Sequence, residues 1–201
     1  MPYQNRVNPC GMLIETSARG RFTGNRGHLH DEHKQIRRHY ETPRWLMCRL
    51  DYPKPTHTVM ALIGYTHLFF LDEPTALAAG HRPCALCMRS RFNQFRDYWM
   101  RVHASTTRPS AADIDAVLHE ERITPEKHKR TYSASLTQLP SGCFVMLTGS
   151  DQPYLVQHDQ LLAWQPDGYA DALARPSDQT VTVLTPPSIV HMLAAGYPLA
   201  S

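Results

Sequence analysis

The chain has 201 residues, of which 42% are hydrophobic and 9% aromatic, so it can form a folded core and is not a disordered tail. Its net charge of +3 permits a polyanionic partner such as nucleic acid but does not by itself indicate one. No run of about 18 apolar residues is present, and Met1–Arg6 lacks the apolar core of a signal peptide, so we expect a cytoplasmic protein with no membrane partner.

Residues 2–27 contain turn signals around short extended segments, and Met12–Ile14 is typical of a strand. Three arginines, Arg19, Arg21 and Arg26, are interspersed with glycines and lie near Phe22. This combination is typical of surfaces that follow a phosphate backbone while an aromatic ring stacks on a base. A solvated loop is the alternative interpretation.

The segment His28–His33 is dense in imidazole and carboxylate groups. Such a cluster can hold a metal ion with a carboxylate orienting the ligands, or it can supply a nuclease-like general base beside a metal. It can equally be a polar loop. The basic segment 34–44 that follows is expected to be exposed.

Residues 45–52 alternate well enough for a half-buried strand, which a proline-rich stretch ends. Cys48 lies on the same face of this strand as two leucines, which suits either a zinc thiolate or a core cysteine. A second predicted strand, 58–63, would form a hairpin with the first and carry Cys48 towards Cys84.

A short helix is predicted from Asp72, a good N-cap, and Gly80 ends it because glycine adopts a left-handed conformation at little cost. Just beyond, Cys84 and Cys87 have the spacing with which one tight turn directs two thiolates at a single zinc ion. A redox pair of the thioredoxin type is an alternative, but no βαβ pattern leads into the motif. A chance pair of buried thiols is another.

The segment 69–87, which reads FFLDEPTALAAGHRPCALC, resembles the second half of the Ada-type zinc domain of bacterial DNA alkylation repair proteins. An aromatic strand, an alanine-rich helix and Arg-Pro-Cys-x-x-Cys follow in this order in that family, and the resemblance extends approximately over residues 64–91. It implies a zinc ion held by Cys84 and Cys87. The other two ligands of the family are upstream cysteines close together, the first of which accepts a methyl group from phosphate. Here the only upstream cysteines are Cys10 and Cys48.

We therefore expect a zinc site with four ligands, Cys84, Cys87, Cys48 and His30. His67 and His81 are the next candidates for the histidine ligand. Four protein ligands leave no open position for an activated water, so the predicted zinc is structural.

A strong amphipathic helix is predicted after Cys87, because apolar side chains from Met88 to Val102 recur at three- and four-residue steps. Arginines, including Arg89 and Arg91, fall mostly on the other faces. They form either a solvated surface or, on a helix that leaves a zinc turn, a surface that contacts phosphates.

The last part of the chain changes in character. Residues 104–110 have the composition of a linker, 111–123 form a short helix, and Lys127–Arg130 is a second basic patch. Short strands separated by turns follow, and they predict a small antiparallel sheet or partial barrel before a last helix at 189–195. Cys143 is most simply a core thiol.

Together these segments predict an α+β protein with a zinc-containing half, 1–103, a linker, 104–110, and a β-rich half, 111–201. We expect it to bind nucleic acid, DNA before RNA, through basic side chains that the zinc site holds in place. The expected contacts are Arg21, Arg26, Arg82, Arg89, Arg91, Lys129 and Arg130.

Three alternatives remain open. A zinc-activated thiolate, Cys48 or Cys84, could accept an alkyl group, since zinc keeps sulfur deprotonated. The His28–His33 cluster could serve a metal-dependent nuclease. The chain could also be a metal-stabilised interaction module without nucleic acid, an alternative that the net charge of only +3 leaves open.

Overall fold

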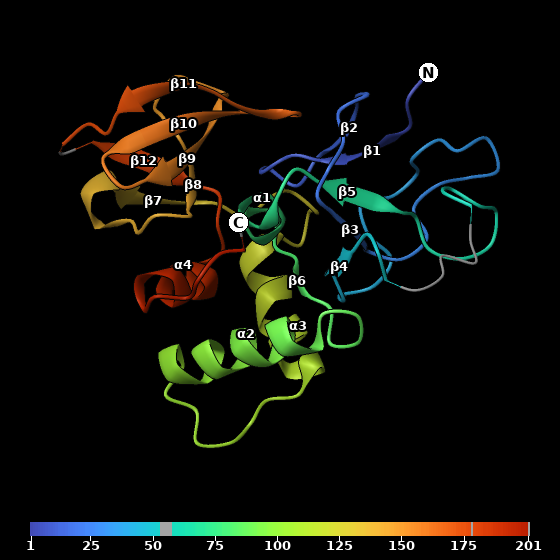
Figure 1. The fold of residues 1–201 in the computed structure, drawn as a ribbon, viewed down its shortest axis with the longest axis horizontal. Coiled ribbons are helices and arrows are strands. Elements are labelled where there is room, and N and C mark those ends of the chain that lie inside the picture. Colours follow the sequence, from blue (N-terminus) through green and yellow to red (C-terminus); the bar gives the residue numbers. More distant parts are fainter. Residues whose placement is uncertain (53–57, 178, 201) are drawn as a thin grey trace.

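The computed structural model describes residues 1–52, 58–177 and 179–200, and these residues form two six-stranded sheets and four α-helices (Figure 1). The predicted α+β class is confirmed, since the strands gather into two sheets of their own and the helices pack around them. No helix of the described residues is both long enough and apolar enough to cross a membrane.

The first sheet has the strand order β2-β1-β5-β3-β4-β6. Its strands are β1 (Gln4–Val7), β2 (Leu13–Glu15), β3 (Phe22–Asn25), β4 (Leu46–Arg49), β5 (Leu68–Phe70) and β6 (Arg82–Pro83). Strand β3 pairs antiparallel with β4 and β5, whereas β6 runs parallel to β4 at the edge of the sheet. The chain leaves the sheet at this edge, immediately before the two-cysteine turn.

The second sheet has the order β11-β10-β9-β8-β12-β7, and all neighbouring strands in it are antiparallel. Its strands are β7 (Tyr132–Ser135), β8 (Phe144–Met146), β9 (Pro153–Gln157), β10 (Gln160–Gln165), β11 (Gly168–Ala174) and β12 (Thr180–Val183). The predicted antiparallel sheet of the last part of the chain is therefore present, with a strand at 168–174 that the sequence did not indicate.

Helix α1 (Glu73–Ala78) lies between the two sheets (Figure 1), and all six of its residues are buried. Asp72 caps it by accepting a hydrogen bond from the amide of Thr75, as its N-cap role predicts. Small side chains let both sheets approach: Ala76 packs in the core of the first sheet and Ala78 in a cluster with residues of the second. Helix α1 is thus the shared centre of the fold.

The other helices are α2 (Arg89–Val102), α3 (Ala111–Arg122) and α4 (Pro187–Ala194). The apolar face predicted for α2 is buried through Phe92, Phe95 and Trp99. These rings belong to one core cluster with side chains of α3, α4 and the second sheet. The hydrophobic core therefore does not divide at the predicted linker, 104–110.

Two local predictions differ from the structure. Residues 58–63 form turns and bends instead of the second strand of a hairpin, and the proline-rich stretch 53–57 before them lies outside the described residues. The partner that brings Cys84 to Cys48 is β6, which adds to the edge of the sheet beside β4. Gly80 does have the predicted left-handed conformation, with φ +85°.

Candidate metal centre

The parallel pairing of β4 and β6 positions the cysteines. Met47 lies opposite Pro83 in the register, and the amide of Cys84 donates a hydrogen bond of 2.8 Å to the Met47 carbonyl. Cys48 comes directly after Met47 within β4, and Cys84 comes directly after Pro83, the last residue of β6. Two short strands therefore bring together cysteines that are far apart in the sequence.

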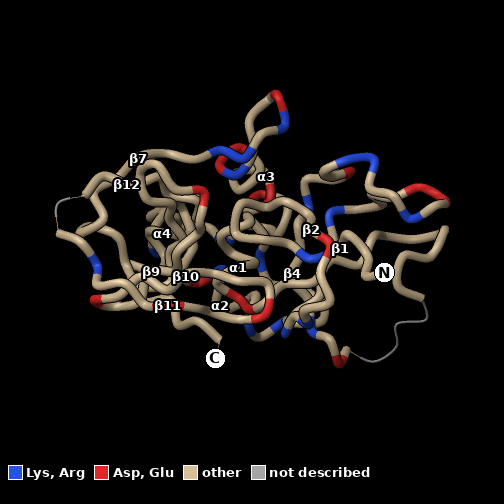
Figure 2. Tube along the Cα trace, turned by 90° about the horizontal axis from the view of Figure 1, so that it is seen from above, with Lys and Arg blue, Asp and Glu red and all other residues tan. Residues whose placement is uncertain are grey.

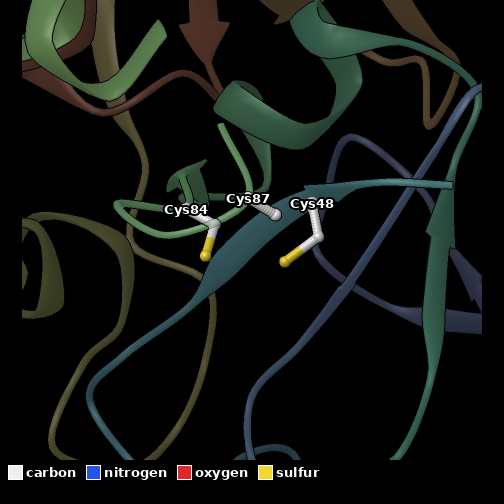
Figure 3. Close-up of side chains that lie close together, drawn as sticks. All are labelled: Cys48, Cys84 and Cys87. Atoms are coloured by element: carbon white, nitrogen blue, oxygen red, sulfur yellow. The ribbon is translucent and has the colours of Figure 1, made fainter. Parts of the chain in front are cut away.

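The sulfur atoms of Cys48, Cys84 and Cys87 all lie within 4.8 Å of one another (Figure 3), and all three residues are partly buried. A tetrahedral zinc ion with Zn–S bonds of about 2.3 Å has sulfurs about 3.8 Å apart, so the cluster needs only a small contraction to hold the ion. Thiolates are soft ligands that bind zinc well, whereas magnesium and calcium bind oxygen ligands. The donor set thus fits zinc.

The turn after β6 is organised around the sulfur of Cys84. The amide of Leu86 donates a hydrogen bond of 3.4 Å to this sulfur, and the amide of Met88 donates one of 3.1 Å to the Cys84 carbonyl. An amide directed at sulfur favours the thiolate. The backbone is therefore prepared for a negative charge at this position.

The three sulfurs also share protons. Hydrogen bonds from Cys48 and Cys87, followed by the amides of Cys87 and Leu86, lower the pKa of Cys84 to about 2. The same contact with Cys84, and then that with Cys87, raises the pKa of Cys48. Deprotonation is thus favoured at Cys84 and disfavoured at Cys48 without metal, and a bound divalent cation would displace the thiol protons.

His30, the predicted fourth ligand, is not brought to this cluster. Its ring is 3% exposed and lies 2.6 Å (Nδ1) from the Thr66 hydroxyl and 3.1 Å (Nε2) from the Ala61 carbonyl. Both ring nitrogens are thereby engaged in fixing the segment that precedes β5. The predicted coordination by His30 is therefore not supported by this geometry, because its ring nitrogens face Thr66 and Ala61.

The two reserve histidines differ in position. His81 is fully buried beside Trp45 and Phe70 and accepts a hydrogen bond of 3.1 Å from Arg26 Nε. Burial and then the charge of Arg26 lower the pKa of His81, so the ring is neutral. His67, which is also buried, lines the cavity beside the three cysteines. Among the described histidines, His67 is the one that shares a cavity with the cluster.

This cavity has a volume of 380 Å³ and is lined by Cys48, Cys84 and Cys87 together with apolar and aromatic side chains. Four of its apolar and aromatic lining residues are exposed, namely Leu50, Tyr52, Tyr65 and Leu86. Exposed apolar groups around a concave site are a feature of binding surfaces. The fourth coordination position of a metal held by the three sulfurs would be reached through this cavity.

The predicted nucleic-acid contacts fall into three groups. Arg21, Arg89 and Arg130 are exposed. Arg26 and Arg82 are 1% and 2% exposed, so neither can contact a nucleic acid at the surface.

The remaining two are partly buried and already bonded within the protein. Arg91 forms an ion pair with Glu73, and Lys129 Nζ donates a hydrogen bond of 2.5 Å to the Ala78 carbonyl. The prediction took these side chains for surface charges, because the sequence shows that a residue is positive but not whether it is buried. Arg49, which is exposed and lines the cavity, was missed, although its place beside Cys48 could have indicated it.

The His28–His33 segment forms a turn stabilised from within. Asp31 accepts hydrogen bonds from the amides of His33 and Gln35 and pairs with Arg37 at 2.6 Å. Within the described residues, the three cysteines are the one group of three ligand atoms close enough to share a metal. The nuclease alternative therefore gains no metal site from this segment.

The chain matches no protein-family model, no curated protein and no solved structure. The similarity to the Ada-type zinc domain thus remains a resemblance of the segment around Cys84 and Cys87.

Proposed function

We propose that the chain binds one zinc ion through Cys48, Cys84 and Cys87, and that this centre organises a nucleic-acid-binding surface. The observation that supports this most directly is the cluster of three sulfurs within 4.8 Å of one another. A zinc ion there would fasten β4 to the turn between β6 and α2. Its binding free energy would add to the free energy of unfolding, since the unfolded chain has no preformed site.

The distribution of charge supports a polyanionic partner for the first part of the chain. Of the 21 Lys and Arg residues, 20 lie in residues 1–130, and Arg175 is the single one beyond. Figure 2 shows these positions around the first sheet and the helices, with few on the second sheet. The net charge of +3 therefore conceals a basic part and an acidic part, and the basic part holds the cysteine cluster.

The surroundings of the cysteine cavity suit single bases or unpaired nucleotides. Exposed Tyr52 and Tyr65 line this cavity together with Arg49, and Arg89 is only two residues beyond Cys87. Tyrosine rings stack on bases, and arginines contact phosphates without reading sequence. DNA with a single-stranded region is the substrate that we propose.

The metal is tested first. Purified protein should contain about one zinc per chain, and Cys48→Ser and Cys84→Ser should each lose it and melt at a lower temperature, because thiolate ligands are removed. Cys143→Ala is the matched control, since Cys143 is buried in the other core and should leave the zinc content unchanged. Full metal content in both serine variants would refute the site.

The partner is tested by titrating labelled single-stranded and duplex DNA at several salt concentrations. Affinity should fall steeply with salt, and Arg49→Gln or Arg89→Gln should each flatten the slope by about one phosphate contact. Arg108→Gln is the control, because Arg108 is exposed in the loop after α2 and paired with Asp97. No binding at low salt, with zinc present, would exclude nucleic acid and leave the interaction module.

A second candidate function is favoured by the exposure of the cysteines. The sequence argument expected a fully coordinated, enclosed centre, whereas the three cysteines are partly buried and line a cavity. Zinc-bound thiolates with access to substrate can accept an alkyl group. Incubation with methylphosphotriester DNA, followed by peptide mass measurement, separates the two: one methyl per chain on Cys48, Cys84 or Cys87 supports alkyl acceptance, and unmodified cysteines support the structural zinc.

A further inference from the structure

A second cavity, which shares no lining residue with the cysteine cavity, is surrounded by positive charge. Arg26, Arg122 and Lys129 line it together with Trp45 and Cys10, and its volume is 250 Å³. The three cations come from separate elements: the end of β3, the end of α3 and the loop before β7. The fold therefore collects them at one place.

These cations are inside the protein. Arg26 and Arg122 are each 1% exposed, and the ammonium group of Lys129 reaches the carbonyl of Ala78, a fully buried residue. Space is made for Arg122 by Gly80, where a Cβ would meet the Arg122 side chain at 2.6 Å. Burying a cation is unfavourable unless a partner compensates its charge.

Their partners in the protein are neutral. Arg26 donates to His81 Nε2 and to the Gly11 carbonyl, while Arg122 donates to the carbonyls of Gly80 and Pro43. Within residues 1–52, 58–177 and 179–200, none of the three cations forms an ion pair with a carboxylate.

The nearest acids are engaged elsewhere. Asp115, which acts on Arg122 through space, is bonded to Arg82 by two hydrogen bonds of 2.8 and 2.6 Å. Asp151 acts on Cys10 but is exposed and does not line the cavity. Asp115 therefore offsets the charge of Arg122 only through space, and no carboxylate of the described residues pairs directly with any of the three cations.

Each of the two guanidinium groups has a donor without a partner among the described residues. Arg26 Nη2 and Arg122 Nε are buried and make no hydrogen bond to residues 1–52, 58–177 or 179–200. Buried donors of this kind are rare in folded proteins, and a water molecule, an ion or another bound group can satisfy them. Both guanidinium groups lie over the Trp45 ring, that of Arg26 at 3.9 Å and that of Arg122 at 4.3 Å from the ring centre, and the ring helps to hold them in place.

Repulsion between the cations also disfavours their charged forms. Burial, and then the charge of Arg122, lower the pKa of Arg26 to about 9, and burial lowers the pKa of Lys129 to about 7. A bound dianion would remove both penalties, since it would pair with the charges and accept from the free donors.

We propose that this cavity binds a phosphate group, either as inorganic phosphate or as the phosphate of a small monoester. A doubly charged tetrahedral oxyanion matches three converging cations, and guanidinium groups bind phosphate oxygens through several hydrogen bonds. The exposed side chains of His39, Lys127 and His128 also line the cavity, so a ligand can enter from solvent. The site is independent of the zinc centre.

Full-length protein in phosphate-free buffer tests the site, with inorganic phosphate and ribose 5-phosphate as probes and sodium chloride at equal ionic strength as control. Either probe should raise the melting temperature by about 3 °C or more at roughly tenfold above its Kd. Tighter binding of the sugar phosphate would identify a monoester, and equal or weaker binding would identify the free anion. No shift beyond that in sodium chloride would overturn the proposal.

The matched variants are Lys129→Met and Arg130→Met, which remove a partly buried and an exposed cation one position apart. Lys129→Met should lose most of the phosphate-dependent shift and should melt no lower than the parent without phosphate, because an uncompensated charge is gone. Arg130→Met should keep the shift. Equal loss in both variants would show general charge screening and overturn the site.

A measurement on the unaltered chain stands apart from these variants. Cys10 lines the cavity, so bound phosphate should slow its alkylation by iodoacetamide, as followed by peptide mass. Cys143, which is buried elsewhere, is the internal reference. An unchanged Cys10 rate at saturating phosphate would contradict binding at this place.

Discussion

The five cysteines of the chain show how strongly the environment decides the chemistry of one residue type. Neighbouring thiols and amides lower the pKa of Cys84, whereas burial raises the pKa of Cys143 to about 12. Cys84 sits in a turn of backbone amides, and Cys143 lies among apolar side chains of the second core. The same side chain is therefore a thiolate in one place and an inert thiol in the other.

We accordingly expect selective alkylation of metal-depleted protein. After treatment with a chelator at pH 7, iodoacetamide should modify Cys84 well before Cys143, because the thiolate is the reactive form. Peptide mass measurements against time give both rates. Faster labelling of Cys143 would mean that the protein had unfolded or that the cluster does not form.

Lys129 predicts a dependence of stability on pH. Its pKa falls from the ordinary 10.5 to about 7 in the folded protein, chiefly because it is buried, and the nearby groups Arg26, Arg122 and Cys10 modify the shift. Between these values the unfolded chain binds more protons than the folded one, so the free energy of unfolding should rise with pH from about 7 to about 10. Urea unfolding in phosphate-free buffer should show a shallower rise for Lys129→Met, and an identical rise would contradict the assignment.

Helix α1 shows how a single short element can hold two sheets together. Its residue Glu73 is fully buried and accepts hydrogen bonds from the Arg91 guanidinium, the Tyr197 hydroxyl and the Ala200 amide. Further along, the Trp164 indole donates to the Thr75 hydroxyl at 3.1 Å. The helix is too short to be stable alone, so these tertiary bonds fix it.

Replacing Glu73 should therefore be costly. We expect Glu73→Ala to lower the free energy of unfolding by at least about 2 kcal/mol, because buried donors lose their acceptor and Arg91 loses its partner. Asp97→Ala removes an exposed pair with Arg108 and should cost less than about 1 kcal/mol. Urea denaturation compares the two, and costs of equal size would contradict a central role for Glu73.

Contacts across the whole molecule connect the two parts that the sequence seemed to separate. Arg82 of β6 pairs with Asp115 of α3 at 2.6 Å, with both side chains almost completely buried. The apolar face of α2 lies in the core that the second sheet completes. The chain is thus expected to fold as one cooperative unit.

A fragment comprising residues 1–103 tests this expectation. It would expose Phe92, Phe95 and Trp99 and leave Arg82 without its acid, so it should show no cooperative thermal transition even with zinc. Circular dichroism against temperature provides the measurement, with the full chain as reference. A sharp transition in the fragment would support two independent domains instead.

Local patterns were sufficient for the features that depend on neighbours in the sequence. The cap at Asp72, the stop at Gly80 and the apolar face of α2 follow from turn chemistry and helical spacing, and all three are present. The Cys-x-x-Cys spacing likewise indicated two ligands in one turn. The choice of Cys48 as a third neighbour rested on an expected hairpin with a strand at 58–63, which is absent, although Cys48 does lie beside Cys84 and Cys87.

Only the tertiary structure decided what depends on contacts between distant segments. The sequence shows that Arg26, Arg82, Arg122 and Lys129 are positive, but burial and pairing come from segments that are remote along the chain. Likewise, the His30 ring is hydrogen-bonded to the Thr66 hydroxyl and does not reach the cysteines. Long-range packing decides where these side chains lie. The sequence around a charged residue can be the same whether the side chain meets water, a carboxylate or a second cation.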